Sequence, residues 1–157
     1  MSDSPTRSVI LAELDEIYRG PAWHGPALLE ALDGVSAEQA AAKPIPDRHS
    51  IWELVRHVAY GRHLMRERLT ETTSDFPLAV AQPWWPVSPT EFGTAAWKAD
   101  LALLDDCHGQ LRAAIVAATD AQLARVPKPG DQSLARQLLG TAIHDAYHAA
   151  QIILLRG

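Results

Sequence analysis

The chain has 157 residues, of which 47% are hydrophobic and 21% are charged, and its net charge is −5. This composition is typical of a soluble globular protein, so we expect one domain over residues 1–157, and the acidic balance argues against a nucleic-acid partner because phosphate binding needs clustered Lys and Arg. No stretch is apolar for long enough to cross a bilayer, and the N-terminus lacks the apolar core of a signal peptide, so we expect a cytoplasmic protein with no membrane partner.

The first half of the chain predicts two long helices. Apolar side chains recur with helical spacing from residue 9 to residue 18 and again from Leu28, and two Gly-Pro pairs between these segments predict a break in the first helix. Residues 34–49 are expected to be a connector that holds one short helical turn capped by Ser36. Ser50 and Glu53 form a capping box, which predicts a second helix over residues 51–71.

The second half predicts a long crossover and two further helices. The segment "TTSDFPLAVAQPWWPVSPTEF" contains four prolines and no sustained helical period, and no strand-like alternation competes with the helical pattern. Thr90 is a candidate cap for a third helix over residues 91–119, and residues 120–132 return the chain to a fourth helix that begins near Ser133. The pattern therefore predicts an all-α four-helix bundle with a long crossover between helices 2 and 3.

A rotation of about 100° per residue sorts the helical histidines into faces. His57 shares a stripe with Leu54 and Leu64 and is expected to point into the bundle, whereas His63 lies among charged residues and is interpreted as a surface histidine. His108 also falls on an apolar stripe, where a buried histidine with hydrogen-bonded ring nitrogens is the simplest interpretation.

The fourth helix carries "IHDAYHAAQI", in which His144, His148 and Gln151 share one face of an otherwise apolar helix. Solvent-facing stripes normally carry Lys, Arg or Glu, so this composition favours a buried polar site. Because Cys107 is the only cysteine, a metal would have to be held by histidine or carboxylate. Histidines on facing helices are a common bundle metal site, so His57 is the natural third ligand.

A zinc-protease motif is the competing interpretation of the same stretch. In the motif His-Glu-x-x-His the glutamate is the general base, and here Asp145 would have to replace it with a shorter side chain. Such proteases also take their third ligand downstream, and only nine residues follow His148. We therefore expect a site shared between helices, with no role as base for Asp145.

Several stretches together resemble the DinB/YfiT-like superfamily, whose members are regarded as metal-dependent enzymes. They are "GPAWHGPALLEAL", "RHSIWEL" continuing through "VRHVAYGRHLMRERL", the Pro-rich crossover and "AIHDAYHAAQIILLR". The resemblance implies a four-helix bundle, commonly a homodimer, and a divalent metal held by His57, His144 and His148. Zinc or nickel is the first expectation for that metal and iron or manganese the second, while His108 corresponds to no known ligand of the family.

Three imidazoles on one divalent ion leave a coordination position open, as in a catalytic site. Understood relatives include S-transferases and isomerases that use low-molecular-weight thiols, and related hydrolases, so the resemblance implies a small-molecule substrate and a possible thiol co-substrate. The alternative is a non-catalytic bundle, either metal-binding or an interaction or stress-associated protein, in which a fourth protein ligand such as His108 closes the site.

Other residues are weaker candidates for a part in the site. Gln151 could orient a ligand ring or a bound water through its amide, or be a buried polar residue satisfied by backbone. Tyr147 is a candidate for shaping the cavity, with packing against a neighbouring helix as the simpler interpretation. His24 is a candidate proton carrier or substrate contact, with plain exposure in a loop as the simpler interpretation. Trp84 and Trp85 could cover one end of the bundle or form a dimer contact, and a rigid plug within the loop is the simpler interpretation.

Overall fold

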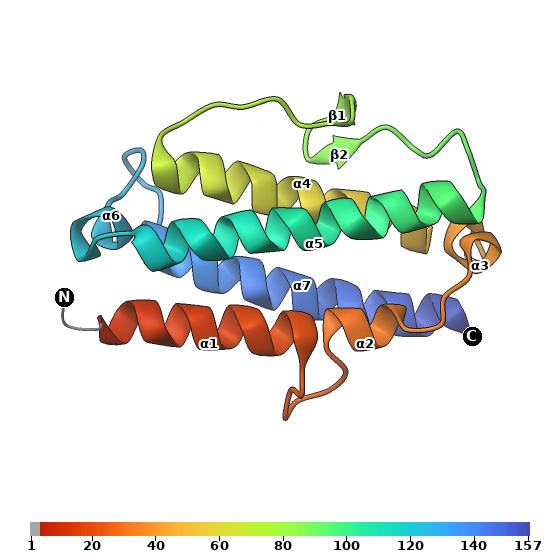
Figure 1. Cartoon of the computed structure of the whole chain (residues 1–157), viewed down its shortest axis with the longest axis horizontal. Helices are drawn as coiled ribbons and strands as arrows, with labels where there is room; N and C mark the ends of the chain where they lie inside the picture. Colours follow the sequence, from red (N-terminus) through yellow and green to blue (C-terminus); the bar gives the residue numbers. More distant parts are fainter. Residues whose placement is uncertain (1–3) are drawn as a thin grey trace.

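The computed structural model describes residues 4–157, and these residues are mostly helical (Figure 1). The first three residues of the expected domain lie outside the described part. Four long helices lie side by side, and contacts join α4 to α5 and α7, and α1 to α5 and α7. These helices are α1 (Pro5–Arg19), α4 (Ile51–Thr70), α5 (Thr94–Ala117) and α7 (Leu134–Arg156).

The predicted break in the first helix is confirmed. α1 ends at Arg19, before the first Gly-Pro pair, and the short helix α2 (Leu28–Leu32) continues along nearly the same line (Figure 1). The connector holds the expected helical turn, α3 (Ala37–Ala41), where the Ser36 hydroxyl accepts a hydrogen bond from the backbone N–H of Gln39 at 3.2 Å.

The capping box at the start of α4 is confirmed as well. Ser50 Oγ accepts from the backbone N–H of Glu53 at 3.2 Å, and Glu53 Oε2 accepts from the backbone N–H of Ser50 at 2.9 Å. Two backbone donors that the helix leaves free are thereby satisfied, which fixes where α4 begins. Figure 1 shows that the crossover then runs back along α4, so that α4 and α5 point in the same direction.

The crossover contains a short hairpin that the sequence pattern did not indicate. A two-stranded antiparallel ladder joins β1 (Val80–Gln82) to β2 (Trp85–Pro86), and strands this short carry too few residues to show alternation in a sequence. Thr90 does not cap the next helix either. Phe92 packs edge-on against Trp52, and α5 begins at Thr94 with Gly93 as its cap.

The return segment contains a further short helix, α6 (Asp120–Ala124), which the sequence analysis did not predict. Its cap, Thr119, forms a capping box with Gln122, and Ser133 caps α7 as expected. Within residues 4–157, every helix falls short of the length and apolar character that a membrane-spanning segment needs.

The core consists of two apolar clusters separated by a layer of polar side chains. The first cluster includes Tyr18, Leu54, Trp97 and Ile152, and the second includes Ile10, Leu69, Leu111 and Leu138. Along α4, α5 and α7, the residues between the clusters include Arg62, His108 and Asp145, each at most 1% exposed. His144, one of the three candidate metal ligands, precedes Asp145 on α7, so the candidate site borders this polar layer.

His63 is not the surface residue that its charged neighbours suggested. It is 7% exposed, and Phe76 from the crossover lies over it with ring centroids 5.2 Å apart. Its Nε2 atom lies 3.4 Å from Glu67 Oε1. The crossover therefore covers a face of α4 that helical periodicity alone assigns to solvent.

Candidate metal centre

The structure brings His57, His144 and His148 together, with one ligand atom of each within 4.8 Å of the others. His144 Nε2 lies 3.0 Å from His57 Nε2 and 2.9 Å from His148 Nε2. Nitrogens bound to one zinc ion lie about 3–4 Å apart, because each Zn–N bond is about 2.0–2.1 Å. His57 comes from α4 and the other two from α7, so the cluster joins two helices that are far apart in sequence.

The hydrogen bonds at the outer ring nitrogens determine which way the lone pairs point. His57 Nδ1 donates to the backbone carbonyl of Trp84 at 2.7 Å, and His148 Nδ1 donates to Gln151 Oε1 at 2.6 Å. Their Nε2 atoms therefore carry lone pairs, and both face His144 Nε2. His144 has at most one proton on that atom, so it cannot donate well to both neighbours. The three nitrogens therefore converge with too few protons to hydrogen-bond to one another, and this arrangement suits a bound cation.

Burial favours the neutral rings that metal binding requires. His57 and His148 are 7% and 5% exposed, whereas the His144 side chain is half-exposed. Burial is the main reason why the pKa of His57 is lowered and that of His148 falls to about 4, and the hydrogen bonds to Trp84 and Gln151 oppose this only in part. The nearby His144 lowers both pKa values further. At neutral pH these two rings present lone pairs to a metal.

A stack of three rings supports His57 from the side of the crossover. The indole of Trp85 lies between the imidazoles of His49 and His57, with centroids 3.5 Å and 4.0 Å away. His49 Nδ1 in turn lies 3.3 Å from Glu53 Oε2. This role of Trp85 and His49 could not be predicted from the sequence, because a short hairpin brings the tryptophan to α4 and helical periodicity does not indicate the path of a hairpin.

Glu53 anchors this stack as an ionised carboxylate. Burial by itself would raise the pKa of Glu53, but hydrogen bonds from the Ser88 hydroxyl, the Ser50 backbone N–H and the Lys43 ammonium outweigh it. Their combined effect lowers the pKa of Glu53 from 4.5 to about 2. The carboxylate thus ties the start of α4 to the segment that follows β2.

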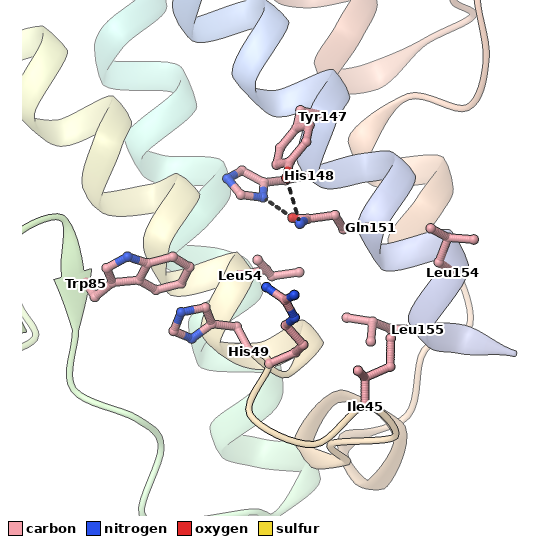
Figure 2. Close-up of a pocket in the computed structure, with 10 residues that line it drawn as sticks. Ile45, His49, Leu54, Trp85, Tyr147, His148, Gln151, Leu154 and Leu155 are labelled. Carbon is pink, nitrogen blue, oxygen red and sulfur yellow. Dashed lines mark hydrogen bonds between the residues drawn. The ribbon is translucent and has the colours of Figure 1, made fainter.

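Two cavities flank the histidine cluster. We call the first, of about 450 Å³, the His148 cavity; its polar lining is Arg48, His49, Tyr147, His148 and Gln151, and its apolar lining is Ile45, Leu54, Trp85, Leu154 and Leu155 (Figure 2). The second, the His57 cavity of about 400 Å³, is lined by both His57 and His144 and by Trp84, Arg68 and Gln137 among others. Small molecules therefore have space next to the ring nitrogens on both sides.

A buried ionic network lies behind the cluster. Arg62 donates to Asp145 and, at 2.8 Å, to His108 Nδ1, and His108 Nε2 lies 3.3 Å from Asp15 Oδ1. Burial lowers the pKa of His108, and the Arg62 charge lowers it further, so this ring is neutral. Asp145 Oδ1 lies 3.9 Å from His144 Nδ1. Asp145 thus faces Arg62 inside the core, where the two side chains pair.

The remaining candidates lie at different distances from the cluster. Gln151 contacts both His148 and Tyr147, whose hydroxyl accepts from Gln151 Nε2 at 3.2 Å. Tyr147 is 62% exposed at the edge of the His148 cavity. His24 is exposed in the loop between α1 and α2, which Figure 1 shows projecting away from β1 and β2. The structure thus brings Gln151 and Tyr147, but not His24, to the cluster.

The protein is therefore mostly helical, and three histidines from two of its core helices converge on a site that could hold a metal ion. A family model described as the DinB superfamily matches residues 22–152. This range is well over half of the chain and contains all three histidines, and the chain belongs to the DinB superfamily. No curated protein and no solved structure gave a significant match.

Proposed function

We propose that the protein is a metal-dependent enzyme that acts on a small molecule, with one divalent ion held by His57, His144 and His148. The observation that carries the proposal is the convergence of three Nε2 atoms beside open cavities. Imidazole ligands suit zinc and nickel first, and iron or manganese next. Membership of the DinB superfamily supports the same assignment.

A divalent ion with three protein ligands acidifies a bound water or binds a thiol as thiolate, so that a nucleophile exists at neutral pH. The residues of this chain would prepare that site. The Trp84 carbonyl and Gln151 Oε1 keep the protons of His57 and His148 on Nδ1, so that Nε2 stays free to bind. Trp85 limits the access of water to one face of His57. This arrangement suits a thiol-dependent transferase or a hydrolase.

The competing function is a non-catalytic metal-binding or interaction bundle, whose site would be closed by a fourth protein ligand. His108 was the candidate for that ligand. It contacts Arg62 and stacks on Tyr18 with centroids 3.8 Å apart, and within residues 4–157 the group of possible ligands contains three histidines without it. This placement favours the enzyme over the closed structural site.

Cobalt(II) substitution tests whether a coordination position is open to a thiol. We expect a cobalt-loaded sample to develop a near-ultraviolet sulfur-to-cobalt charge-transfer band when a small thiol such as cysteine is added, because the thiolate would take the open position. The His148→Ala variant, loaded in the same way, serves as control. A cobalt spectrum that neither thiol nor azide changes would indicate a closed site and contradict the proposal.

We also infer that α1, α4, α5 and α7 form one DinB-like four-helix bundle, with residues 71–93 as the crossover, and that two copies form a homodimer. The contacts among the four helices support the bundle. The dimer follows from the family resemblance, as a cytoplasmic location follows from the composition. Light scattering coupled to gel filtration measures the mass, and a mass of one chain at micromolar concentration would contradict the dimer.

A further inference from the structure

Among residues 4–157, the lining of the His148 cavity includes one permanently charged side chain, Arg48, and no acidic side chain. We propose that this cavity binds a small organic anion, a carboxylate on an apolar body, with Arg48 holding the anionic end. The inference deepens the proposed function, since it names the substrate class of the same site.

The charge of Arg48 is free to meet a ligand. Its side chain has no ion pair or hydrogen bond within residues 4–157, although the net charge of the chain is −5. Arg56, one of the nearby arginines, is bound to Asp100 at 2.6 Å, and Arg19 is bound to Asp105 at 2.9 Å. A guanidinium offers a planar pair of donors that matches the two oxygens of a carboxylate.

The rest of the lining selects for an apolar body. Leu54, Leu155 and Trp85 face the cavity, and its volume of about 450 Å³ lies in the range of small-molecule sites. An inorganic anion would leave these surfaces in contact with water, whereas a carboxylate with a hydrocarbon chain would cover them. A cationic ligand would be repelled by Arg48 and would find no carboxylate.

The proposed anion site and the candidate metal ligand His148 share one cavity. Figure 2 shows His148 and Tyr147 toward one end of the cavity and Ile45 at the opposite end, with His49 between them. Arg48 precedes His49 in the loop before α4, and its side chain lines the same cavity. An anion held by Arg48 would cover Leu54 and Leu155 with its apolar body and lie in the space beside His148.

The His57 cavity does not offer the same chemistry. It is lined by an arginine as well, Arg68, but that guanidinium donates to Gln137 Oε1 at 2.6 Å. One side of this guanidinium is therefore already engaged, whereas the Arg48 guanidinium has no such partner within residues 4–157. The organic anion is therefore assigned to the His148 side, which leaves the His57 side for a second reactant such as a thiol.

Titration calorimetry with three probes of equal chain length tests the assignment on the metal-loaded protein. We expect octanoate to bind more tightly than octanol, and octylammonium to bind most weakly. Arg48→Gln should weaken octanoate binding roughly tenfold and leave octanol unchanged, because it removes the charge and keeps an amide. Arg136→Gln, at an exposed arginine outside the cavity, should bind octanoate like the wild type.

A second pair of variants probes the cavity from the same loop, at a residue three positions before Arg48. Ile45 is 49% exposed in a loop, so replacing it should leave the fold intact. Ile45→Asp should abolish octanoate binding by repulsion, and Ile45→Asn should retain most of it. Equal affinity for octanoate and octanol would overturn the assignment, as would octanoate binding that survives Arg48→Gln and is lost in His148→Ala, since the carboxylate would then be on the metal.

The metal content of each sample separates this inference from the proposed function. Octanoate binding that depends on Arg48 in protein that takes up no metal would overturn the enzyme and support the anion site. One metal ion per chain together with no preference for octanoate over octanol would support the metal-dependent enzyme and overturn the anion site.

Discussion

The indole of Trp85 lies flat on the imidazole of His57, with ring centroids 4.0 Å apart and planes 14° apart. The carbonyl of the preceding residue, Trp84, accepts the proton of the same ring. A hairpin of the crossover therefore holds both the plane and the tautomer of a candidate ligand that belongs to α4. Removing a group that orients a metal ligand in this way commonly lowers metal affinity about tenfold or more.

We predict that Trp85→Ala weakens zinc binding roughly tenfold, because His57 loses the surface that fixes its ring. Trp85→Phe should restore most of the affinity, since a phenyl ring can still stack. Competition with a zinc chelator measures the dissociation constant. Trp23→Ala is the matched control, because Trp23 is 89% exposed in a loop and should leave the affinity unchanged. Wild-type affinity in Trp85→Ala would show that the stack does not position the ligand.

Gln151 offers a second test of ring orientation, now at His148. Gln151→Ala removes the acceptor of the Nδ1 proton and should weaken zinc binding by about 10- to 100-fold. Gln151→Glu keeps an acceptor oxygen and adds a negative charge, so it should bind zinc at least as tightly as the wild type. The same chelator competition distinguishes the two variants. A loss in Gln151→Glu equal to that in Gln151→Ala would mean that the amide acts only through packing.

The buried pair of Arg62 and Asp145 should dominate the stability of the polar layer. Asp145→Asn leaves the Arg62 charge unpaired in the core and should lower the free energy of unfolding by about 3–5 kcal/mol. Replacing both residues, Arg62→Met with Asp145→Leu, should cost less than that single change. Urea unfolding measures all of these values.

The exposed pair of Arg19 and Asp105 is the control for the buried one. Both side chains are about half-exposed, so Arg19→Gln should change the free energy of unfolding by less than about 1 kcal/mol. If Asp145→Asn lowered the free energy of unfolding as little as Arg19→Gln does, the prediction would be wrong, and water would have to reach the pair of Arg62 and Asp145.

Because the pKa of Glu53 is lowered in the folded protein, we predict that the free energy of unfolding falls in acid. Its folded pKa is about 2 and its ordinary value 4.5, so the unfolded chain binds the proton more tightly. The stabilisation is complete above pH 4.5 and is lost as the pH falls from there toward 2, with a total of about 3 kcal/mol. Glu53→Gln should be less stable than the wild type at neutral pH and should lose less on acidification. If the free energies of unfolding of the wild type and Glu53→Gln differed by the same amount at every pH, this account would be contradicted.

The candidate metal ligands show which parts of the site can be predicted from the sequence alone. His57 was found because a helical stripe places it with Leu54, and the start of α4 was found because Ser50 and Glu53 cap each other with their own side chains. Both signals are local, since residues within one or two turns determine them. The pairing of His57 with His148 needed the further idea that bundle sites form between facing helices.

The residues that the sequence analysis missed depend on contacts between distant segments. His63 looked exposed on its helix and is covered by Phe76 of the crossover. The roles considered for Trp85 were a cover over one end of the bundle, a dimer contact and a rigid plug in the loop, and none of them includes its stacking between His49 and His57. The path of a Pro-rich crossover is set by what it packs against, which neither periodicity nor turn composition reports.

Metal stoichiometry tests the central claim most directly. Protein purified without chelator, or stripped and offered zinc, nickel, iron and manganese in turn, should hold one divalent ion per chain by elemental analysis. His57→Ala should lose that ion while circular dichroism shows the helices intact, and His24→Ala, at an exposed loop histidine, should retain it. Wild-type protein that takes up none of the four metals, or His57→Ala that binds them like the wild type, would contradict the three-histidine site.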